Sequence, residues 1–233
     1  MWNRFGRVYL VNGDVTRYRR ESMMEEVRRI GLSCKDQFRL LCGDFKSSHD
    51  AHLVAMRDFA EDRSVGGCAL IIEDDTRFLR DLGELKSLLA SAPPADIVNF
   101  DPFFHLTKET LRQTQGNRFM YWTRGIYGTS CYSVSKVAAM VLWMSYTRHP
   151  EEPPDSHLFL GHQDLCTVVS TKHACVQLTY EDSVNSKRFG VDVQHKFYGN
   201  EGVDYSKYAV PEGFGYGKAI VPDGRIGDIR PCV

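Results

Sequence analysis

The chain contains the run Cys68-Ala69-Leu70-Ile71-Ile72-Glu73-Asp74-Asp75, which is the clearest indication of its fold class. Five uninterrupted apolar residues after Gly66 and Gly67 are typical of a short central strand that is covered on both faces. This strand runs directly into three carboxylates. In open α/β sheets, ligands bind beyond the carboxyl ends of the strands, so the acids stand where a binding site is expected.

Short apolar runs and longer helical patterns alternate on both sides of this stretch, which indicates an α/β domain. The patterns predict further strands at 8–12, 38–42, 97–100, 126–134 and 174–178. They predict helices at 18–30, after 47–50, at 82–90, at 135–146 and, more briefly, from 161 to 169. The stretch 102–124 is long, aromatic and without a period, so we expect a functional or mobile loop there.

Length and composition bound the class of protein. The 233 residues are 42% hydrophobic and 25% charged, which favours one globular domain, 1–196, with a glycine- and aromatic-rich tail or lid at 197–233. Lys and Arg number 29 against 30 Asp and Glu, and this balance argues against a nucleic-acid partner. The sequence predicts a cytoplasmic protein without an integral membrane segment. Its seven cysteines are scattered and form no C-x-x-C motif, and it shows no apolar leader and no run long enough to span a bilayer.

The three acids indicate a metal site. Adjacent carboxylates repel one another, and a divalent cation compensates that repulsion when they are partly buried. Side chains alternate along an extended segment, so Glu73 and Asp75 are expected on one side and Asp74 on the other. One or two of the acids, not three, should therefore reach the ion. The alternative is an acidic loop that enters a helix, since acids favour the first turn.

Four blocks of the sequence, in this order and spacing, resemble glycosyltransferase family 25, the lipooligosaccharide and collagen galactosyltransferases. The similarity covers about residues 8–190, with departures at Gly13 and Ala51 and a tail that does not align. The blocks are Val8-Tyr9-Leu10-Val11-Asn12 with Arg19-Arg20, Ala51 to Arg57, Ala69 to Asp75, and Gly128 to Lys136 with Ala138-Ala139. The resemblance implies a GT-A-like, nucleotide-diphospho-sugar-binding domain with a central mixed, mostly parallel sheet flanked by helices.

The resemblance also implies a function: Mn²⁺- or Mg²⁺-dependent transfer of a sugar from a nucleotide-sugar donor, a UDP-sugar, to a hydroxyl of a glycan or glycoprotein acceptor. Asp75, with Glu73, is expected to hold the metal, which neutralises the leaving diphosphate. His162 and His195 are candidates for a further ligand. The candidate donor-binding residues are Asn12, Tyr18 (base stacking), Arg19 and Arg20 (phosphate), His52, Glu73 and Asp74 (ribose). For the arginines, Tyr18 and His52, the alternative is an ordinary surface or packing role.

An inverting transfer needs a base that takes the proton of the acceptor hydroxyl. Asp164, after the break at Pro150 to Pro154, is the first candidate, and Asp101, at the end of the strand 97–100, is the second. Asp164 has an alternative reading as a helix N-terminal acid. Two other functions remain open. A metal-dependent phosphoesterase or nuclease would need a second carboxylate such as Asp101 close to the first acids, and a non-catalytic nucleotide-sugar binder would lack turnover.

Overall fold

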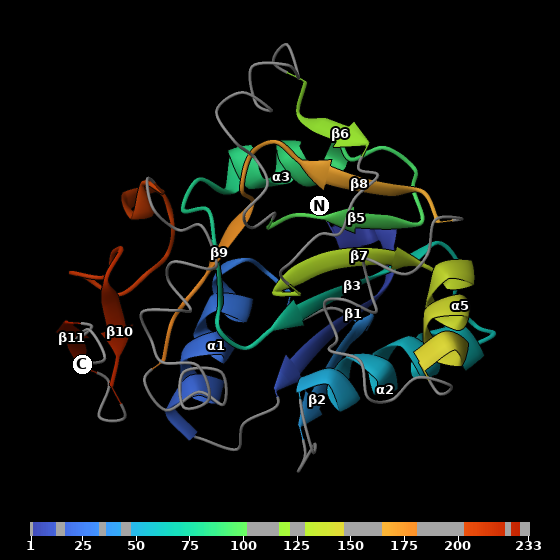
Figure 1. Ribbon diagram of the computed structural model, residues 1–233, viewed down its shortest axis with the longest axis horizontal. Coiled ribbons are helices and arrows are strands. Elements are labelled where there is room, and N and C mark those ends of the chain that lie inside the picture. Colours follow the sequence, from blue (N-terminus) through green and yellow to red (C-terminus); the bar gives the residue numbers. More distant parts are fainter. Residues whose placement is uncertain are drawn as a thin grey trace.

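The computed structural model describes residues 2–12, 17–32, 36–42, 48–101, 117–121, 129–146, 165–180, 203–221 and 225–228. A seven-stranded sheet in the order β2-β1-β3-β7-β5-β8-β6 forms its centre (Figure 1). Strands β7 and β6 run opposite to the other five, so the sheet is mixed and mostly parallel, as predicted. Its strands are β1 (Phe5–Asn12), β2 (Phe38–Cys42), β3 (Cys68–Glu73), β5 (Ile97–Asn99), β6 (Phe119–Tyr121), β7 (Cys131–Ser135) and β8 (Thr167–Ser170).

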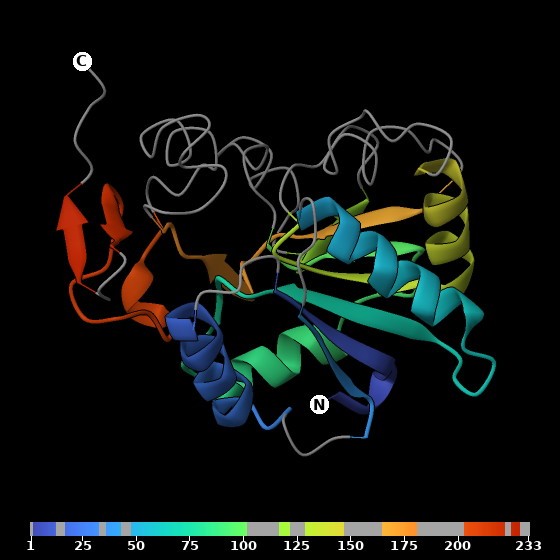
Figure 2. The ribbon, with the colours of Figure 1, turned by 90° about the horizontal axis from the view of Figure 1, so that it is seen from below.

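Both faces of the sheet are apolar, and among the helices that the structure describes, two cover each face. In β1, Val8 and Leu10 belong to one buried cluster, whereas Tyr9 and Val11 belong to another. The first cluster includes side chains of α1 (Arg17–Arg29) and α3 (Leu82–Ala90), and the second includes side chains of α2 (Ser48–Glu61) and α5 (Lys136–Tyr146). Figure 2 shows these pairs on opposite sides of the sheet. The chain is therefore an α/β domain with helices on both faces.

Two small sheets extend the main one. Strand β4 (Thr76–Phe78) pairs with β9 (Cys175–Gln177), and β10 (Lys218–Ile220) pairs with β11 (Ile226–Asp228). Short 3₁₀ helices are η1 (Trp2–Arg4) and η2 (Tyr205–Lys207). Single bridges join Leu79 to Tyr208 and Tyr180 to Ile220, so the described C-terminal residues pack against the domain. The predicted boundary between 196 and 197 lies outside the described residues.

The structure corrects several sequence predictions. The segment predicted as a short helix contains Val168 and Val169, and these residues lie in strand β8. The predicted irregular stretch 102–124 contains strand β6, which pairs with β8. The chain after the acids forms β4, and the tail forms the β10–β11 hairpin, neither of which was predicted. Each missed strand has three or four residues, too few for a period to show.

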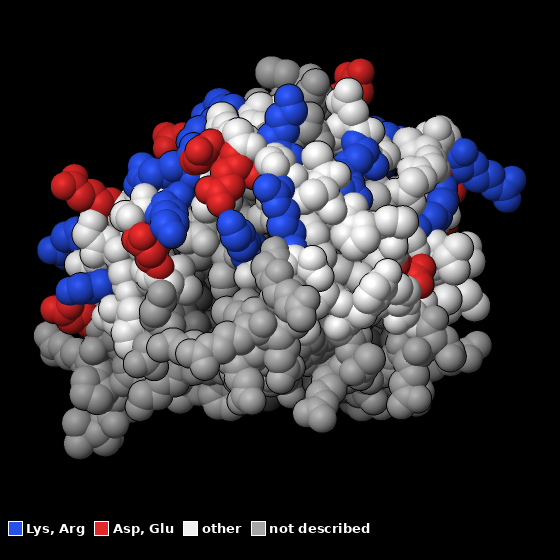
Figure 3. Space-filling model, turned by 90° about the horizontal axis from the view of Figure 1, so that it is seen from above, with Lys and Arg blue, Asp and Glu red and all other residues white. Residues whose placement is uncertain are grey.

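The surface of the described residues is mixed in charge. On the face drawn in Figure 3, basic and acidic side chains are interspersed, with large uncharged areas between them. Among the helices that the structure describes, none is both long enough and apolar enough to cross a bilayer.

Candidate functional site

Most of the polar residues that were predicted for the site and that the structure describes lie at one edge of the main sheet. Strands β1, β3 and β5 end there at Asn12, Glu73 and Asn99, and the antiparallel β7 starts there after Ser130. In the register of the sheet, Val11 lies beside Glu73, so Asn12 lies next to the acids. Asn12 is 2% exposed and has interactions of its own, which is consistent with a place in the wall of the site.

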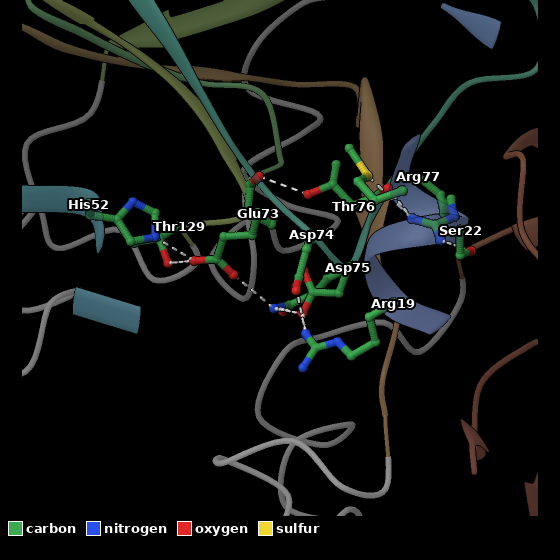
Figure 4. A network of polar contacts seen from close by, with 12 residues as sticks. Arg19, Ser22, His52, Glu73, Asp74, Asp75, Thr76, Arg77 and Thr129 are labelled. Atoms are coloured by element: carbon green, nitrogen blue, oxygen red, sulfur yellow. Dashed lines mark hydrogen bonds and ion pairs between the residues drawn. The ribbon is translucent and has the colours of Figure 1, made fainter. Parts of the chain in front are cut away.

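Glu73 is held by neighbours that lie far from it in the sequence (Figure 4). His52 Nε2 lies 2.9 Å from Glu73 Oε1, and the other ring nitrogen of His52 lies 3.0 Å from the Tyr132 hydroxyl. The Thr129 hydroxyl also donates to Glu73 Oε1, and Gln177 Nε2 donates to Oε2 at 3.3 Å. Burial raises the pKa of Glu73, but the hydrogen bonds from His52 and Thr129 and the charges of His52 and Arg19 outweigh burial and lower it. Glu73 is therefore a well-compensated anion.

Asp75 is less well compensated. Gln177 Nε2 donates to Asp75 Oδ2 at 2.9 Å, and Arg19 Nη2 lies 3.8 Å from the same oxygen. The other oxygen, Oδ1, is buried and has no hydrogen-bond partner among the described residues. Burial and the charges of Glu73 and Asp74 together raise the pKa of Asp75 well above its usual value. An ionised Asp75 is thus costly unless a further cation approaches it.

Asp74 points toward the helix α1 side of the acids, where Arg19 meets it. Arg19 Nη2 donates to Asp74 Oδ1 at 2.6 Å, and both side chains are more than nine-tenths buried. The Arg19 guanidinium also stacks over the ring of Tyr180, 4.7 Å from its centroid, and Tyr18 packs against the same ring at 5.7 Å. Arg19 therefore acts as an internal counter-ion of the acids.

Arg19 and Arg20 do not point to one place, although they are adjacent in the sequence. The Arg20 side chain is exposed and lies beside the thiol of Cys42 at the end of β2. Burial raises the pKa of Cys42, and the nearby Arg20 opposes that effect. Of the two arginines predicted to meet phosphate, only Arg19 directly contacts the described acids.

Asp101 forms a second polar cluster at the same edge. Its Oδ2 accepts from the Ser130 hydroxyl at 2.5 Å, and its Oδ1 lies 3.0 Å from His173 Nδ1. Asp101 is 1% exposed, whereas the His173 side chain is 25% exposed. Thr129 and Ser130 are consecutive, so one short stretch of backbone links the Glu73 cluster to the Asp101 cluster.

Sequence reasoning missed several of these contacts. Gln177, which bridges Glu73 and Asp75, carries no signal in a single sequence. Thr129 and Ser130 stood in a resembling block, but no role was assigned to them. His173 was missed because the preceding segment was read as a helix, which hid the fact that His173 follows the end of strand β8.

Three predicted site residues, Asp164, His162 and His195, lie outside the described residues, so their roles stay predictions.

Within the described ranges, no three His, Cys, Asp or Glu side chains come together in an arrangement that could hold a metal ion. The alternation predicted for the three acids agrees with the contacts, because Glu73 and Asp75 share Gln177 while Asp74 binds Arg19.

Comparison with known proteins gives a distant structural similarity. No family model matches the chain, and no curated protein matches it significantly. Among solved structures, the chain is similar to the crystal structure of a glycosyltransferase involved in the glycosylation of the major capsid of PBCV-1. The two are 13% identical, the match covers 62% of this chain and 68% of the other, and the TM-score is 0.34. A similarity this loose is not evidence for a shared activity.

Proposed function

We propose that this protein is a metal-dependent glycosyltransferase that moves a sugar from a nucleotide-diphosphate donor, a UDP-sugar, to an acceptor hydroxyl on a glycan or glycoprotein. One observation carries the proposal: three carboxylates stand at the carboxyl end of the central strand, and one of them, Asp75, is buried with too few partners to balance its charge. Membership in glycosyltransferase family 25 is part of the proposal and rests on the four sequence blocks.

The residues fit a divalent cation. Asp75 Oδ1 is a buried oxygen without a partner among the described residues, and Mn²⁺ and Mg²⁺ prefer oxygen ligands. Glu73 is less available, because His52, Thr129 and Gln177 occupy its oxygens. Asp75 is therefore the leading ligand in our proposal. With few protein ligands, the remaining positions suit donor phosphates, water and the predicted His162 or His195.

The donor would lie across the acids and helix α1. In this proposal, Asp74 and Asn12 meet a ribose or another polar group of the nucleotide, and the Tyr18–Tyr180 pair supplies an aromatic surface for the base. Arg19 pairs with Asp74 at 2.6 Å and lies 3.8 Å from Asp75. A phosphate that arrives together with a cation would let Arg19 exchange one anion for another without leaving a buried charge uncompensated.

In such a transfer, a divalent cation held by Asp75 would supply positive charge to stabilise the leaving diphosphate. The protein's own residues position that charge: His52, Thr129 and Gln177 fix the acids, and Arg19 limits their mutual repulsion. A base must also accept the hydroxyl proton. Asp164 is the sequence-based candidate, whereas Asp101 has both of its oxygens occupied by Ser130 and His173.

Binding and turnover together test the proposal. The wild-type protein is screened by thermal shift against UDP-galactose, UDP-glucose, UDP-N-acetylglucosamine and UDP, each with manganese and with chelator. Donor hydrolysis is followed as UDP release. We expect stabilisation by at least one donor that depends on manganese, with slow UDP release. Manganese-dependent stabilisation without turnover would favour a non-catalytic binder, and no stabilisation would contradict the proposal.

The phosphoesterase alternative has a separate readout. It would need a second carboxylate facing the first acids at a two-metal spacing of about 4 Å. Asp101, the residue named for that role, hydrogen-bonds Ser130 and His173 instead. Release of inorganic phosphate from a nitrophenyl phosphate, with no release of UDP from any UDP-sugar, would favour this alternative.

A further inference from the structure

The structure contains an aspartate–histidine pair at the edge of the sheet where the acids lie, and the proposed function does not yet use it. Asp101 follows strand β5, and His173 lies between β8 and β9. His173 Nδ1 lies 3.0 Å from Asp101 Oδ1, and the Ser130 hydroxyl donates to the other oxygen of Asp101 at 2.5 Å. Asp101 is almost fully buried, so it is a fixed anchor for the imidazole.

The backbone around His173 is fixed as well. Ala174 donates its N–H to the carbonyl of Phe100 at 3.0 Å, and the Tyr208 hydroxyl donates to the carbonyl of His173 at 3.3 Å. The backbone N–H of Asp101 donates to the side chain of Asn99 at 2.8 Å. Both partners of the pair are thus held by groups outside the pair, which restricts how the ring can turn.

The orientation of the His173 ring leaves Nε2 available as a proton acceptor. A carboxylate at Nδ1 favours the tautomer with the proton on Nδ1, so the lone pair of a neutral ring lies on Nε2. No described residue hydrogen-bonds Nε2, and a quarter of the His173 side chain is exposed. An imidazole that is anchored at one nitrogen by a buried carboxylate and accessible at the other has the arrangement of a general base.

The pair is also connected to the acids. Ser130, which donates to Asp101, accepts through its carbonyl oxygen the backbone N–H of Glu73 and the hydroxyl of Thr76, both at 2.8 Å. Thr129, the preceding residue, donates to the Glu73 carboxylate. The dyad and the acids are therefore positioned by the same two residues at one edge of the sheet.

We infer that His173, oriented by Asp101, is the general base of the proposed transfer; this inference rests on the proposed function. The acceptor oxygen forms a bond to the anomeric carbon of the donor sugar, and the bond from that carbon to the diphosphate oxygen breaks, its electron pair leaving with the diphosphate. The hydroxyl proton passes to Nε2 of His173. The imidazolium is stabilised by Asp101 and then loses its proton to solvent. Asp101 is a positioning residue, not the base.

The test uses the full chain with manganese and follows UDP release from the UDP-sugar that the wild type hydrolyses fastest, with water in the place of the acceptor. His173→Ala should lower turnover by about 10²-fold to 10⁴-fold and leave the affinity for UDP unchanged. Free imidazole should restore part of the turnover of this variant in a saturable manner, because the vacated site is open to solvent. Lys172→Ala, an exposed neighbour in the same turn, is the matched control and should behave as the wild type.

Two further variants separate catalysis from folding. His173→Gln keeps a donor that can reach Asp101 but cannot accept a proton from a hydroxyl, so it should lose turnover while melting near the wild type. Asp101→Asn should lose turnover without a change in UDP affinity, and imidazole should not rescue it because His173 still fills its place. If His173→Ala unfolds, the comparison is made on His173→Gln.

Different results would overturn the assignment of His173 and the proposed function. Near-normal turnover of folded His173→Gln, or loss of turnover in Asp164→Asn beside an active His173→Ala, overturns the assignment and returns the base to Asp164. A wild type that binds UDP with manganese but releases none from any UDP-sugar overturns the proposed function, and this inference with it.

Discussion

The two ends of the main sheet differ in how well their charged side chains are paired. At the amino end, charged side chains have near partners: Arg7 binds Asp62 at 2.5 Å, Lys136 donates to the carbonyl of Val65 at 2.8 Å, and Arg4 donates to that of Ala92 at 3.2 Å. Arg7 Nε is buried without a hydrogen-bond partner among the described residues, but the charge of Arg7 is balanced by Asp62. At the carboxyl end, Asp75 is buried among like charges with an oxygen that no described residue reaches. The first arrangement stabilises the fold, whereas the second leaves a charge for a ligand to balance.

Substitution of Asp75, at the carboxyl end, should change activity the most. Asp75→Asn keeps the shape of the side chain and removes the charge, so transfer should fall by at least about 10²-fold. The melting temperature in chelator should stay the same or rise, because an amide has no charge to desolvate. UDP release and thermal unfolding measure the two effects. A variant that is both unstable and active would show that Asp75 is structural.

Removal of the metal should have the next largest effect. Without a cation, the donor diphosphate would approach Glu73, Asp74 and Asp75 directly, so affinity for a UDP-sugar should fall at least about 10-fold, or about 1.4 kcal/mol. Calorimetry in manganese and in chelator gives the difference. Asp75→Asn, measured in manganese, should bind as weakly as the wild type in chelator. Equal affinities of the wild type in both conditions would argue against the site.

A substitution at the amino end should lower the stability of the protein but leave its turnover unchanged. Arg4→Ala leaves the carbonyls of Leu89 and Ala92, at the end of α3, without their shared donor and should cost about 1 to 3 kcal/mol of unfolding free energy. Turnover of the folded protein should not change. Urea unfolding and UDP release together make this measurement. A loss of turnover without a loss of stability would contradict the division of roles between the two ends.

The smallest predicted change is in the stability contributed by Asp62. This residue is an aspartate at the amino end of the sheet and serves as the counterpart of Asp75. Hydrogen bonds from Ser64, followed by one from Arg7 and its charge, lower the pKa of Asp62 to about 2. A lowered pKa means that the contribution of Asp62 to stability is present above the unfolded value near 3.9 and is lost as pH falls toward 2. Asp62→Asn should therefore destabilise slightly at pH 7 and less at pH 2, as followed by denaturant unfolding at both pH values.

The sequence predicted the elements whose pattern is long or unusual. The apolar spacing of Met23, Val27 and Ile30 located α1, and the run 68–72 located the central strand and its acids. The prediction of secondary structure was wrong where the pattern was ambiguous. Val168 and Val169 fit a buried strand and a helix equally well, and they lie in strand β8.

The sequence predicted the acids of the candidate site and two of their supports, His52 and Arg19, but not Gln177 or His173. Glu73, Asp74 and Asp75 were visible because three adjacent carboxylates after an apolar run are unusual. Gln177 and His173 come from a segment about a hundred residues away, and their contacts depend on which strands pair. Strand pairing is a property of the tertiary fold, so a local pattern in one sequence does not contain it.

The pairing of β4 with β9 also has a consequence for folding. Asp74 and Asp75 lie between β3 and β4, and the backbone N–H of Leu178 donates to the carbonyl of Asp75 at 2.7 Å. That contact closes a loop of about a hundred residues, and contacts of such sequence separation form late. During synthesis, the ribosome would release strands β1 to β3 well before Gln177 exists to meet the acids. The acids can therefore take up their final geometry only after most of the chain has left the ribosome, so a nascent chain would carry the motif before it has a site.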